Sequence, residues 1–304
     1  MNVSICNIKK SFGELLVLND INLNIVSGSA FGLLGRNGAG KTTLIRIMMD
    51  VFPSDSGEIL FDGVKLKNSD LRVGYLPEER GLYPRKIILE QLTYLGLLRG
   101  MKKNAAEKNI KYWLERMEMD QYLNKRLDTL SKGNQQKIQL AATLVNDPEV
   151  IILDEPFSGL DPVNSLMLKD IVVDRIKAGK VVIFSSHQMS YVEEFCDDVA
   201  IINKGKIVLN DNLRDVKRSY SRTKIKISFD NENISKQIDM LKSTVLSDIV
   251  ENVSHNGLDS IINIKKADMR GELLTRLVQN NIEIERFEII EPTLQEIFIE
   301  KAGD

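Results

Sequence analysis

The sequence has few cysteines, no excess of basic residues and no long apolar runs, and each of these absences argues against one class of protein. Its 304 residues include only Cys6 and Cys196, which lack metal-ligand spacing and favour a reducing compartment over a secreted disulfide scaffold. Lysine and arginine number 41 against 43 acidic residues, so no basic excess indicates a nucleic-acid surface. Apolar runs such as 150–153 and 181–184 are far shorter than the roughly 20 residues that span a bilayer, and no export signal is visible at the N-terminus.

The composition is that of a soluble globular protein, with 43% hydrophobic and 28% charged residues. Ile21, Leu23 and Ile25 alternate with polar residues, and residues 59–61 run into the turn pair Asp62-Gly63, which predicts an antiparallel β opening. Between residues 85 and 147 the apolar period becomes helical, and Trp113 is predicted to be a packing residue. After Pro148, apolar strands alternate with helices, which predicts a parallel sheet with crossover helices.

The last third of the chain predicts a second, smaller domain. A polar, basic stretch at residues 211–223 is typical of a linker. Beyond it the pattern is βαββαβ, the order of a ferredoxin-like module, with a last helix from Thr293. The expected elements are strands at 224–229, 249–253, 260–265 and 282–290 and helices at 234–241 and 269–279.

The strongest motif is G-R-N-G-A-G-K-T-T at residues 35–43, which follows an apolar strand and opens a helix. It meets the phosphate-loop pattern G-x-x-x-x-G-K-[ST] in the required strand-loop-helix context. The glycines let the backbone N–H groups wrap a phosphate, Lys41 reaches the β- and γ-oxygens, and Thr42 offers a hydroxyl to Mg²⁺. The predicted nucleotide contacts are Gly35, Arg36, Asn37, Gly38, Ala39, Gly40, Lys41, Thr42 and Thr43.

Acidic and imidazole side chains follow two of the later strands. V-I-I-L-D-E supplies Asp154, predicted as a second-sphere magnesium ligand, and Glu155, which would take a proton from the water attacking the γ-phosphorus or orient that water. His187, in F-S-S-H-Q-M, lies beyond the strand at 181–184, on the edge where open α/β sheets bind ligands. From its position alone, a structural and a catalytic role for His187 both stay open.

A second anion-binding pattern occurs in L-S-K-G-N-Q-Q-K at residues 130–137. Ser131 is suited to cap a helix N-terminus, and Gly133 leaves the backbone open to a phosphate. Because the chain already has a phosphate loop, the residues alone leave open whose phosphate this second loop would hold.

Five motifs together answer that question: G-R-N-G-A-G-K-T-T, L-S-K-G-N-Q, V-I-I-L-D-E-P, S-G-L-D-P and F-S-S-H. In this order they resemble the nucleotide-binding domain of an ABC transporter, over roughly residues 1–217. The resemblance implies two domains that dimerise head to tail around two ATP molecules, with residues 158–161 along the interface and His187 catalytic. It also implies that Phe12 stacks on adenine, although from the residues alone Phe12 is an ordinary core residue. Ser131, Gly133 and Asn134 would then hold the γ-phosphate bound by Lys41 of the other subunit.

Two departures from the family pattern concern the site. Lys132 and Asn134 replace a glycine and the glutamine of the usual L-S-G-G-Q signature, while Ser131 and Gly133 are retained. Glu78, in Y-L-P-E-E-R-G-L-Y, stands where the family has a glutamine; its carboxylate can ligate Mg²⁺, or it is simply a surface charge. The same stretch is similar to exporter subunits of sodium-efflux and antibiotic-resistance pumps. That resemblance implies a permease-facing surface between residues 80 and 130.

The combined prediction is an α/β P-loop NTPase of ABC type, with a mixed sheet, an antiparallel β subdomain and a helical subdomain, followed by an α+β ferredoxin-like module. The expected domains are 1–217, with helices at about 85–147, and 222–304. The expected function is the ATP-hydrolysing subunit of a transporter, a homodimer using ATP and Mg²⁺, at the inner face of the membrane through a separate permease and without nucleic acid. The alternatives are a soluble ABC-type ATPase acting on ribosomes or DNA, and a simple P-loop kinase. The C-terminal module would brace the dimer or bind a small regulatory ligand.

Overall fold

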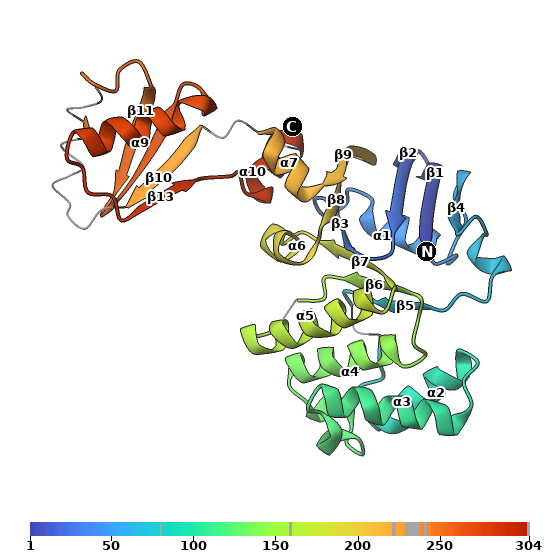
Figure 1. Ribbon diagram of the computed structural model, residues 1–304. Helices are drawn as coiled ribbons and strands as arrows, with labels where there is room; N and C mark the ends of the chain where they lie inside the picture. Colours follow the sequence, from blue (N-terminus) through green and yellow to red (C-terminus); the bar gives the residue numbers. More distant parts are fainter. Residues whose placement is uncertain are drawn as a thin grey trace. The chain divides into compact units, whose positions relative to one another are not determined.

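The structure is a computed structural model that describes residues 1–79, 81–157, 160–220, 223–228, 238–239, 242 and 244–302. It divides into two compact units (Figure 1). The first is Met1–Leu213 together with Phe298–Asp304, and the second is Arg214–Ile297.

A six-stranded sheet forms the centre of the first unit. Its strands, in spatial order, are β5 (Val73–Leu76), β6 (Val150–Asp154), β7 (Val181–Ser186), β3 (Ala30–Leu34), β8 (Asp198–Asn203) and β9 (Lys206–Asn212). All neighbouring pairs are parallel except β8 and β9, which confirms the predicted mixed sheet. Every residue of β3 and β6 is buried, as is typical of parallel strands covered on both faces.

A separate antiparallel sheet confirms the predicted β opening, with the order β2 (Leu15–Val26), β1 (Asn2–Phe12) and β4 (Ser56–Phe61). Asp62 and Gly63 follow β4 with φ angles of 47° and 84°, the left-handed conformation that the turn pair predicts. One hydrophobic cluster joins Ile5 of this sheet, Leu44 of helix α1 (Lys41–Met48) and Ile152 of the six-stranded sheet. The helix that opens at Lys41 is therefore fixed by a core that includes both sheets.

The helices of the first unit fall into two sets. Three of them, α2 (Ile88–Leu98), α3 (Lys103–Arg116) and α4 (Lys132–Leu144), pack on one another (Figure 1). Trp113 of α3 is 3% exposed, which confirms it as a packing residue. The remaining helical segments are α5 (Pro162–Lys177), α6 (Met189–Phe195) and the 3₁₀ turns η1 (Leu66–Asn68), η2 (Asp120–Tyr122) and η3 (Leu127–Thr129).

The second unit has a four-stranded antiparallel sheet in the order β11 (Val250–Asn256), β12 (Asp259–Ile264), β10 (Lys224–Ser228) and β13 (Arg286–Ile289). Its helical segments are η4 (Ala267–Met269) and α9 (Arg270–Gln279), and α10 (Leu294–Ala302) crosses the division between the units. Leu273 and Leu277 of α9 are fully buried against this sheet's core. The predicted helix at 234–241 lies largely outside the described residues. Ile238 and Asp239, the two residues of this segment that the structure describes, are helical.

The expected linker at 211–223 is wrong in part, because β9 runs to Asn212 and α7 (Leu213–Ser219) follows it directly. Leu213 and Val216 are each 5% exposed. Because residues three apart lie on the same face of a helix, these two buried side chains anchor α7 although its other residues are mostly polar.

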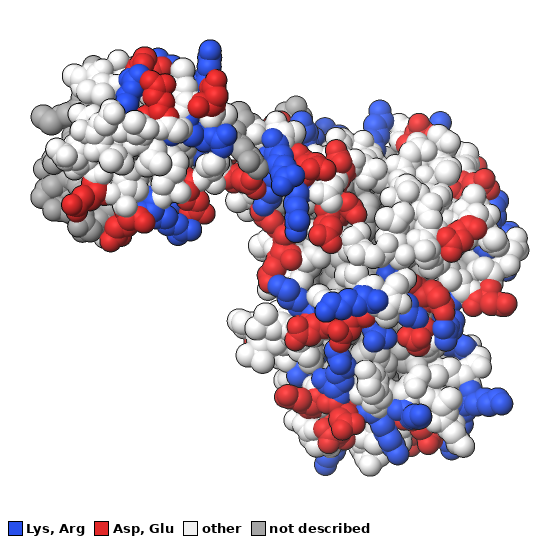
Figure 2. Space-filling view, in the orientation of Figure 1, with Lys and Arg blue, Asp and Glu red and all other residues white. Residues whose placement is uncertain are grey.

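On the face shown in Figure 2, lysines and arginines are interspersed with acidic residues over the first unit. The first unit also has ion pairs such as Arg116 with Asp174 and Lys169 with Glu194. In the part of the chain that the structure describes, no helix combines the length and the apolar character needed to cross a membrane.

Candidate functional site

The phosphate loop occupies the sharp connection between β3 and α1. Gly40 is the N-cap of α1, with φ of 113°, and a Cβ there would lie 2.6 Å from Leu18 Cδ2. A Cβ on Gly35 would lie 2.6 Å from the carbonyl oxygen of Ile202. Only glycine fits these two positions, so the loop stays pressed against β2 and β8.

A pocket of about 400 Å³ opens over this loop. The loops after β3, β5 and β6 converge here, because the carboxyl ends of parallel strands meet at one edge of the sheet. The pocket thus brings together Lys41, Thr42, Glu78, Asp154 and Glu155, as the sequence predicts. Its full lining is Leu15, Val17, Arg36, Asn37, Gly38, Gly40, Lys41, Thr42, Thr43, Glu78, Asp154 and Glu155.

Lys41 is 8% exposed and lies over the phosphate loop. Its Nζ donates hydrogen bonds to the carbonyl oxygens of Gly35 at 2.7 Å and Arg36 at 3.3 Å. Burial lowers the pKa of Lys41, while the negative charges of Glu155, Asp154 and Glu78 oppose that shift. A buried ammonium group facing three carboxylates is well suited to an anionic ligand that also carries a cation.

Asp154 ends β6 and is 3% exposed. Burial raises the pKa of Asp154, although a hydrogen bond of 3.3 Å from the Tyr75 hydroxyl to its Oδ2 favours the ionised form. Thr42, Glu78 and Asp154 supply only oxygen atoms, the donors that Mg²⁺ prefers. Among the described residues, no group of three or more histidines, cysteines and acids is placed to hold a metal ion by itself.

Glu155 has the most constrained carboxylate of the pocket. Its backbone φ is 49°, a strained value for a residue with a side chain, and it is 5% exposed. Its Oε1 accepts a hydrogen bond from the His187 backbone N–H at 2.7 Å and lies 2.5 Å from His187 Nδ1. Its Oε2 accepts from the Ser186 hydroxyl at 2.9 Å. Three contacts from the end of β7 therefore fix this carboxylate, while the His187 side chain stays 51% exposed.

Ser131 caps α4, as its position predicts, and its hydroxyl accepts from the Asn134 N–H at 3.3 Å. Ser131, Gly133 and Asn134 begin this helix but do not line the pocket over the phosphate loop. The two loops that the sequence predicts to bind anions therefore do not share one pocket within the chain. Residues 158–161 are predicted to lie along the dimer interface. Of these, Ser158 and Gly159 lie outside the described residues.

Phe12 is 50% exposed and packs edge-on against Phe52, with ring centroids 5.7 Å apart. It is not an ordinary core residue, and it does not line the pocket. Leu15 and Val17 of β2 do line it, and sequence reasoning missed both, as it missed Tyr75. The alternation of apolar and polar residues predicts a strand, but it does not show which of the strand's apolar side chains reach a neighbouring loop.

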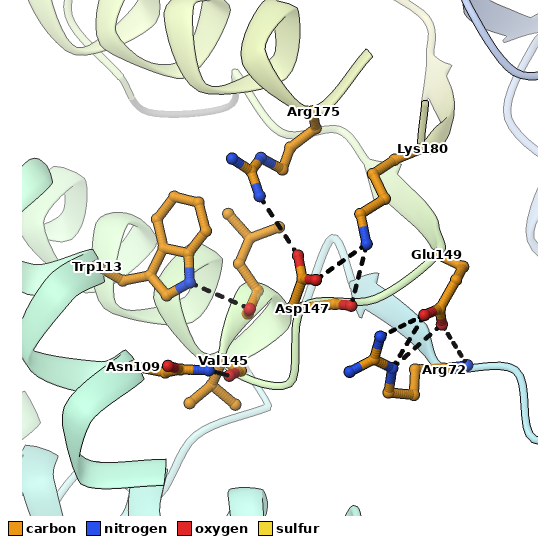
Figure 3. A network of polar contacts seen from close by, with 9 residues as sticks. Arg72, Asn109, Trp113, Val145, Asp147, Glu149, Arg175 and Lys180 are labelled. Carbon is orange, nitrogen blue, oxygen red and sulfur yellow. Dashed lines mark hydrogen bonds and ion pairs between the residues drawn. The ribbon is translucent and has the colours of Figure 1, made fainter. Parts of the chain in front are cut away.

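The far end of α4 is anchored by side chains of α3 (Figure 3). Trp113 Nε1 donates to the Leu144 carbonyl at 3.1 Å, and Asn109 Nδ2 donates to that of Val145 at 2.9 Å. These bonds satisfy carbonyls that a helix end leaves unpaired. Nearby, Arg175 and Lys180 pair with Asp147, and Arg72 pairs with Glu149 at the start of β6 (Figure 3).

Two family models match the chain. The model described as ABC transporter matches residues 18–158, and the model of the C-terminal domain of DrrA1-3-like ATP-binding proteins matches residues 212–302. The uncharacterized ABC transporter ATP-binding protein YhaQ of Bacillus subtilis is 39% identical over 99% of this chain and 98% of its own length. The linearmycin resistance ATP-binding protein LnrL of the same organism is 28% identical over 98% of this chain and 97% of its own length.

Solved structures share the fold of the first unit. An ATP-binding subunit of an ABC transporter aligns with a TM-score of 0.67 at 24% identity, covering 72% of this chain and 93% of its own. The ADP conformation of another ATP-binding cassette aligns with a TM-score of 0.62 at 18% identity, covering 71% of this chain and 92% of its own.

Proposed function

Because the chain belongs to the family of ABC transporter ATP-binding proteins, it is an ATPase subunit, and we propose that two copies close around two ATP molecules to drive a separate membrane permease. The observation that carries this proposal is the pocket that joins the phosphate loop to Glu155 and Asp154. A domain arrangement of 1–217 for nucleotide binding and 222–304 for the accessory module accompanies it. The two matched regions, 18–158 and 212–302, support that arrangement.

The phosphate loop and Lys41 bind the ATP phosphates, and Glu155 acts on the attacking water. Glu155 is fixed by Ser186 and His187, so its carboxylate is preoriented to accept a proton from that water or to align it. His187 keeps a half-exposed ring beside this carboxylate, where it can contact the γ-phosphate. Phe12 and the apolar edge of β2 are assigned to the adenine side, since Leu15 and Val17 already line the pocket.

Thr42, Asp154 and Glu78 would hold Mg²⁺ together with the phosphate oxygens, with Asp154 in the second sphere. When bound, this ion neutralises charge that develops on the β- and γ-phosphates. Glu78 takes the part of a neutral glutamine in the family pattern, so its carboxylate binds the cation more strongly than an amide would. The hydroxyl and the two carboxylates form an oxygen-only set, which suits magnesium.

The second loop serves the partner copy. Ser131, Gly133 and Asn134 lie at a helix N-terminus, where N–H groups and the helix dipole favour an anion. Since they do not line the pocket of their own chain, a γ-phosphate held by Lys41 of a second copy is the ligand that they fit. Each ATP then joins two copies, and hydrolysis loosens them.

The permease, the cellular site and the substrate class are proposed from relatives. LnrL is named for linearmycin resistance, and a Streptococcus pyogenes relative, SrtF, is named for lantibiotic transport. We therefore assign this chain to an exporter at the inner face of the cell membrane, with its permease on the 80–130 surface. The relatives' names give no support to the alternative of a soluble ATPase acting on ribosomes or DNA.

Glu155→Gln tests the central assignment. The amide keeps the shape of the side chain but removes the proton acceptor, so ATP turnover is expected to fall at least about 100-fold while ATP binding persists. Size-exclusion chromatography with ATP should then show a stable dimer. Glu194→Gln, an exposed glutamate paired with Lys169, is the matched control and should behave as the wild type. Wild-type turnover by Glu155→Gln, or a monomer in ATP, would contradict the proposal.

A further inference from the structure

Two polar side chains on one face of α4 hold the strand that leads into the nucleotide pocket. Gln139 Nε2 donates hydrogen bonds to the carbonyl oxygens of Pro77 and Glu79, both at 3.3 Å. One turn further along, the Thr143 hydroxyl lies 3.2 Å from the carbonyl oxygen of Tyr75 and 3.0 Å from that of Gln139, and its single proton is shared between them. Residues four apart lie on the same face of a helix, so the two contacts follow one line along β5 and its extension.

The two carbonyls bonded by Gln139 flank Glu78, which lines the pocket. Pairing of β5 with β6 ends at Leu76 opposite Leu153, so the Glu78 segment continues beyond the sheet ladder. Gln139 itself is 4% exposed, and its amide would be left without these partners if the segment moved away. Its position is therefore suited to fix the backbone carbonyl groups of the residues before and after Glu78.

Glu78 needs such a restraint because it shares the pocket with two other carboxylates. Asp154 and Glu155 are buried beside it, and like charges at close range repel one another. The Glu78 side chain is exposed, so an unrestrained segment would turn it out toward solvent. The hydrogen bonds from Gln139 oppose that movement.

We propose that Gln139 is a positioning residue that holds the Glu78 carboxylate toward the magnesium side of the nucleotide pocket. This inference rests on the role of Glu78 proposed above. It also gives α4 two tasks in one chain, since the helix presents Ser131 at its N-terminus and restrains Glu78 two turns later. In the alternative, Gln139 serves packing alone, and its loss would lower stability without affecting magnesium.

The test measures binding rather than turnover, in full-length protein carrying Glu155→Gln. A fluorescent ATP analogue is titrated in EDTA and then at increasing Mg²⁺ for the parent and for Gln139→Met, which keeps the side-chain length and removes the amide. Binding in EDTA should stay within about twofold, while the Mg²⁺ concentration at half-maximal binding should rise about tenfold, as for other residues that orient a metal ligand.

Asn109→Leu is the matched control. It also removes an amide that donates to a backbone carbonyl at α4, that of Val145, but at the end away from the pocket. It should lower the thermal midpoint and leave the Mg²⁺ titration unchanged. An equal Mg²⁺ shift in Asn109→Leu, or none in a folded Gln139→Met, would overturn the inference.

A double-mutant cycle with Glu78→Ala separates the two proposals. If Gln139 acts through Glu78, Glu78→Ala shifts the Mg²⁺ titration and Gln139→Met adds nothing in that background. Additive shifts would overturn the role of Gln139 while leaving Glu78 as a ligand. No shift in Glu78→Ala alone would remove both the magnesium role of Glu78 and the inference built on it.

Discussion

Three carboxylates share the pocket, and their surroundings differ enough to give them different tasks. Asp154 is buried and accepts a hydrogen bond from the Tyr75 hydroxyl. Glu155 is buried with a backbone N–H, a hydroxyl and an imidazole around it. Glu78 lies exposed on the segment beyond β5. Acids in such different environments can serve different steps of one reaction. The proposed roles follow this pattern: Asp154 on the magnesium side, Glu155 directing the attacking water, and Glu78 as a more mobile magnesium ligand.

The burial of Asp154 has a cost for the unliganded protein. Because burial raises its pKa, the ionised carboxylate destabilises the fold at neutral pH relative to a neutral side chain. Asp154→Asn is therefore expected to raise the free energy of unfolding by about 1 kcal/mol, a thermal shift of roughly 2–4 °C. It should also abolish Mg²⁺-dependent ATP turnover.

Calorimetry without nucleotide and an ATPase assay check this pair of effects. Asp174→Asn is the control, since that acid is exposed and pairs with Arg116, and its stability should change by less than about 0.5 kcal/mol. A less stable Asp154→Asn protein would show that the Tyr75 hydrogen bond outweighs the burial of charge.

At the scale of the element, α4 is held at both ends by side chains. Ser131 caps its N-terminus, and Trp113 and Asn109 bind the carbonyls at its C-terminus. Ser131 thus has a structural role and a proposed phosphate-binding role at one position. A substitution that keeps the first and removes the second can separate them.

Ser131→Asp is such a substitution. Aspartate caps a helix as well as serine and interacts favourably with the helix dipole, so the stability of the unliganded protein should stay within about 0.5 kcal/mol. Its carboxylate would repel the partner's γ-phosphate, so the ATP-dependent dimer should weaken at least about tenfold. Ser131→Ala should instead cost about 1 kcal/mol of stability through the lost cap.

Thermal unfolding without nucleotide and analytical ultracentrifugation with ATP in the Glu155→Gln background distinguish these outcomes. Unimpaired dimerisation of Ser131→Asp would exclude a phosphate at this helix end.

At this scale, the features that could be predicted from the sequence lie in contiguous segments of the chain. The phosphate loop and the Asp154 strand end are contiguous patterns, so spacing alone identified them, and the structure brings Lys41 and Asp154 into one pocket. Tyr75 and Gln139 act through β5, whose place beside β6 depends on pairing between distant segments. The helix α7 was missed because two apolar residues, Leu213 and Val216, decide it within a polar stretch.

At the scale of the whole molecule, the chain combines two compact units. The first carries every pocket residue named above, and the second carries a four-stranded antiparallel sheet in the 2-3-1-4 order of a ferredoxin-like module. We expect this second unit to brace the dimer, since modules of this kind often pair through sheets or helices. The central expectation, however, is that one copy completes the site of the other.

Crosslinking between copies tests this expectation most directly. One copy carries Asn37→Cys, in the exposed part of the phosphate loop, and a differently tagged copy carries Ser131→Cys, both with Glu155→Gln and Cys6→Ser. The remaining thiol, Cys196, is 6% exposed and burial raises its pKa, so it should react slowly.

With ATP, a short thiol-reactive crosslinker should join the two tags, because closure brings Ser131 of one copy to the phosphate loop of the other. With ADP the yield should fall at least about tenfold, since the γ-phosphate that bridges the copies is missing. Equal crosslinking with ATP and ADP, or crosslinks in copies that carry Asn37→Cys alone, would show that nucleotide does not join the two half-sites.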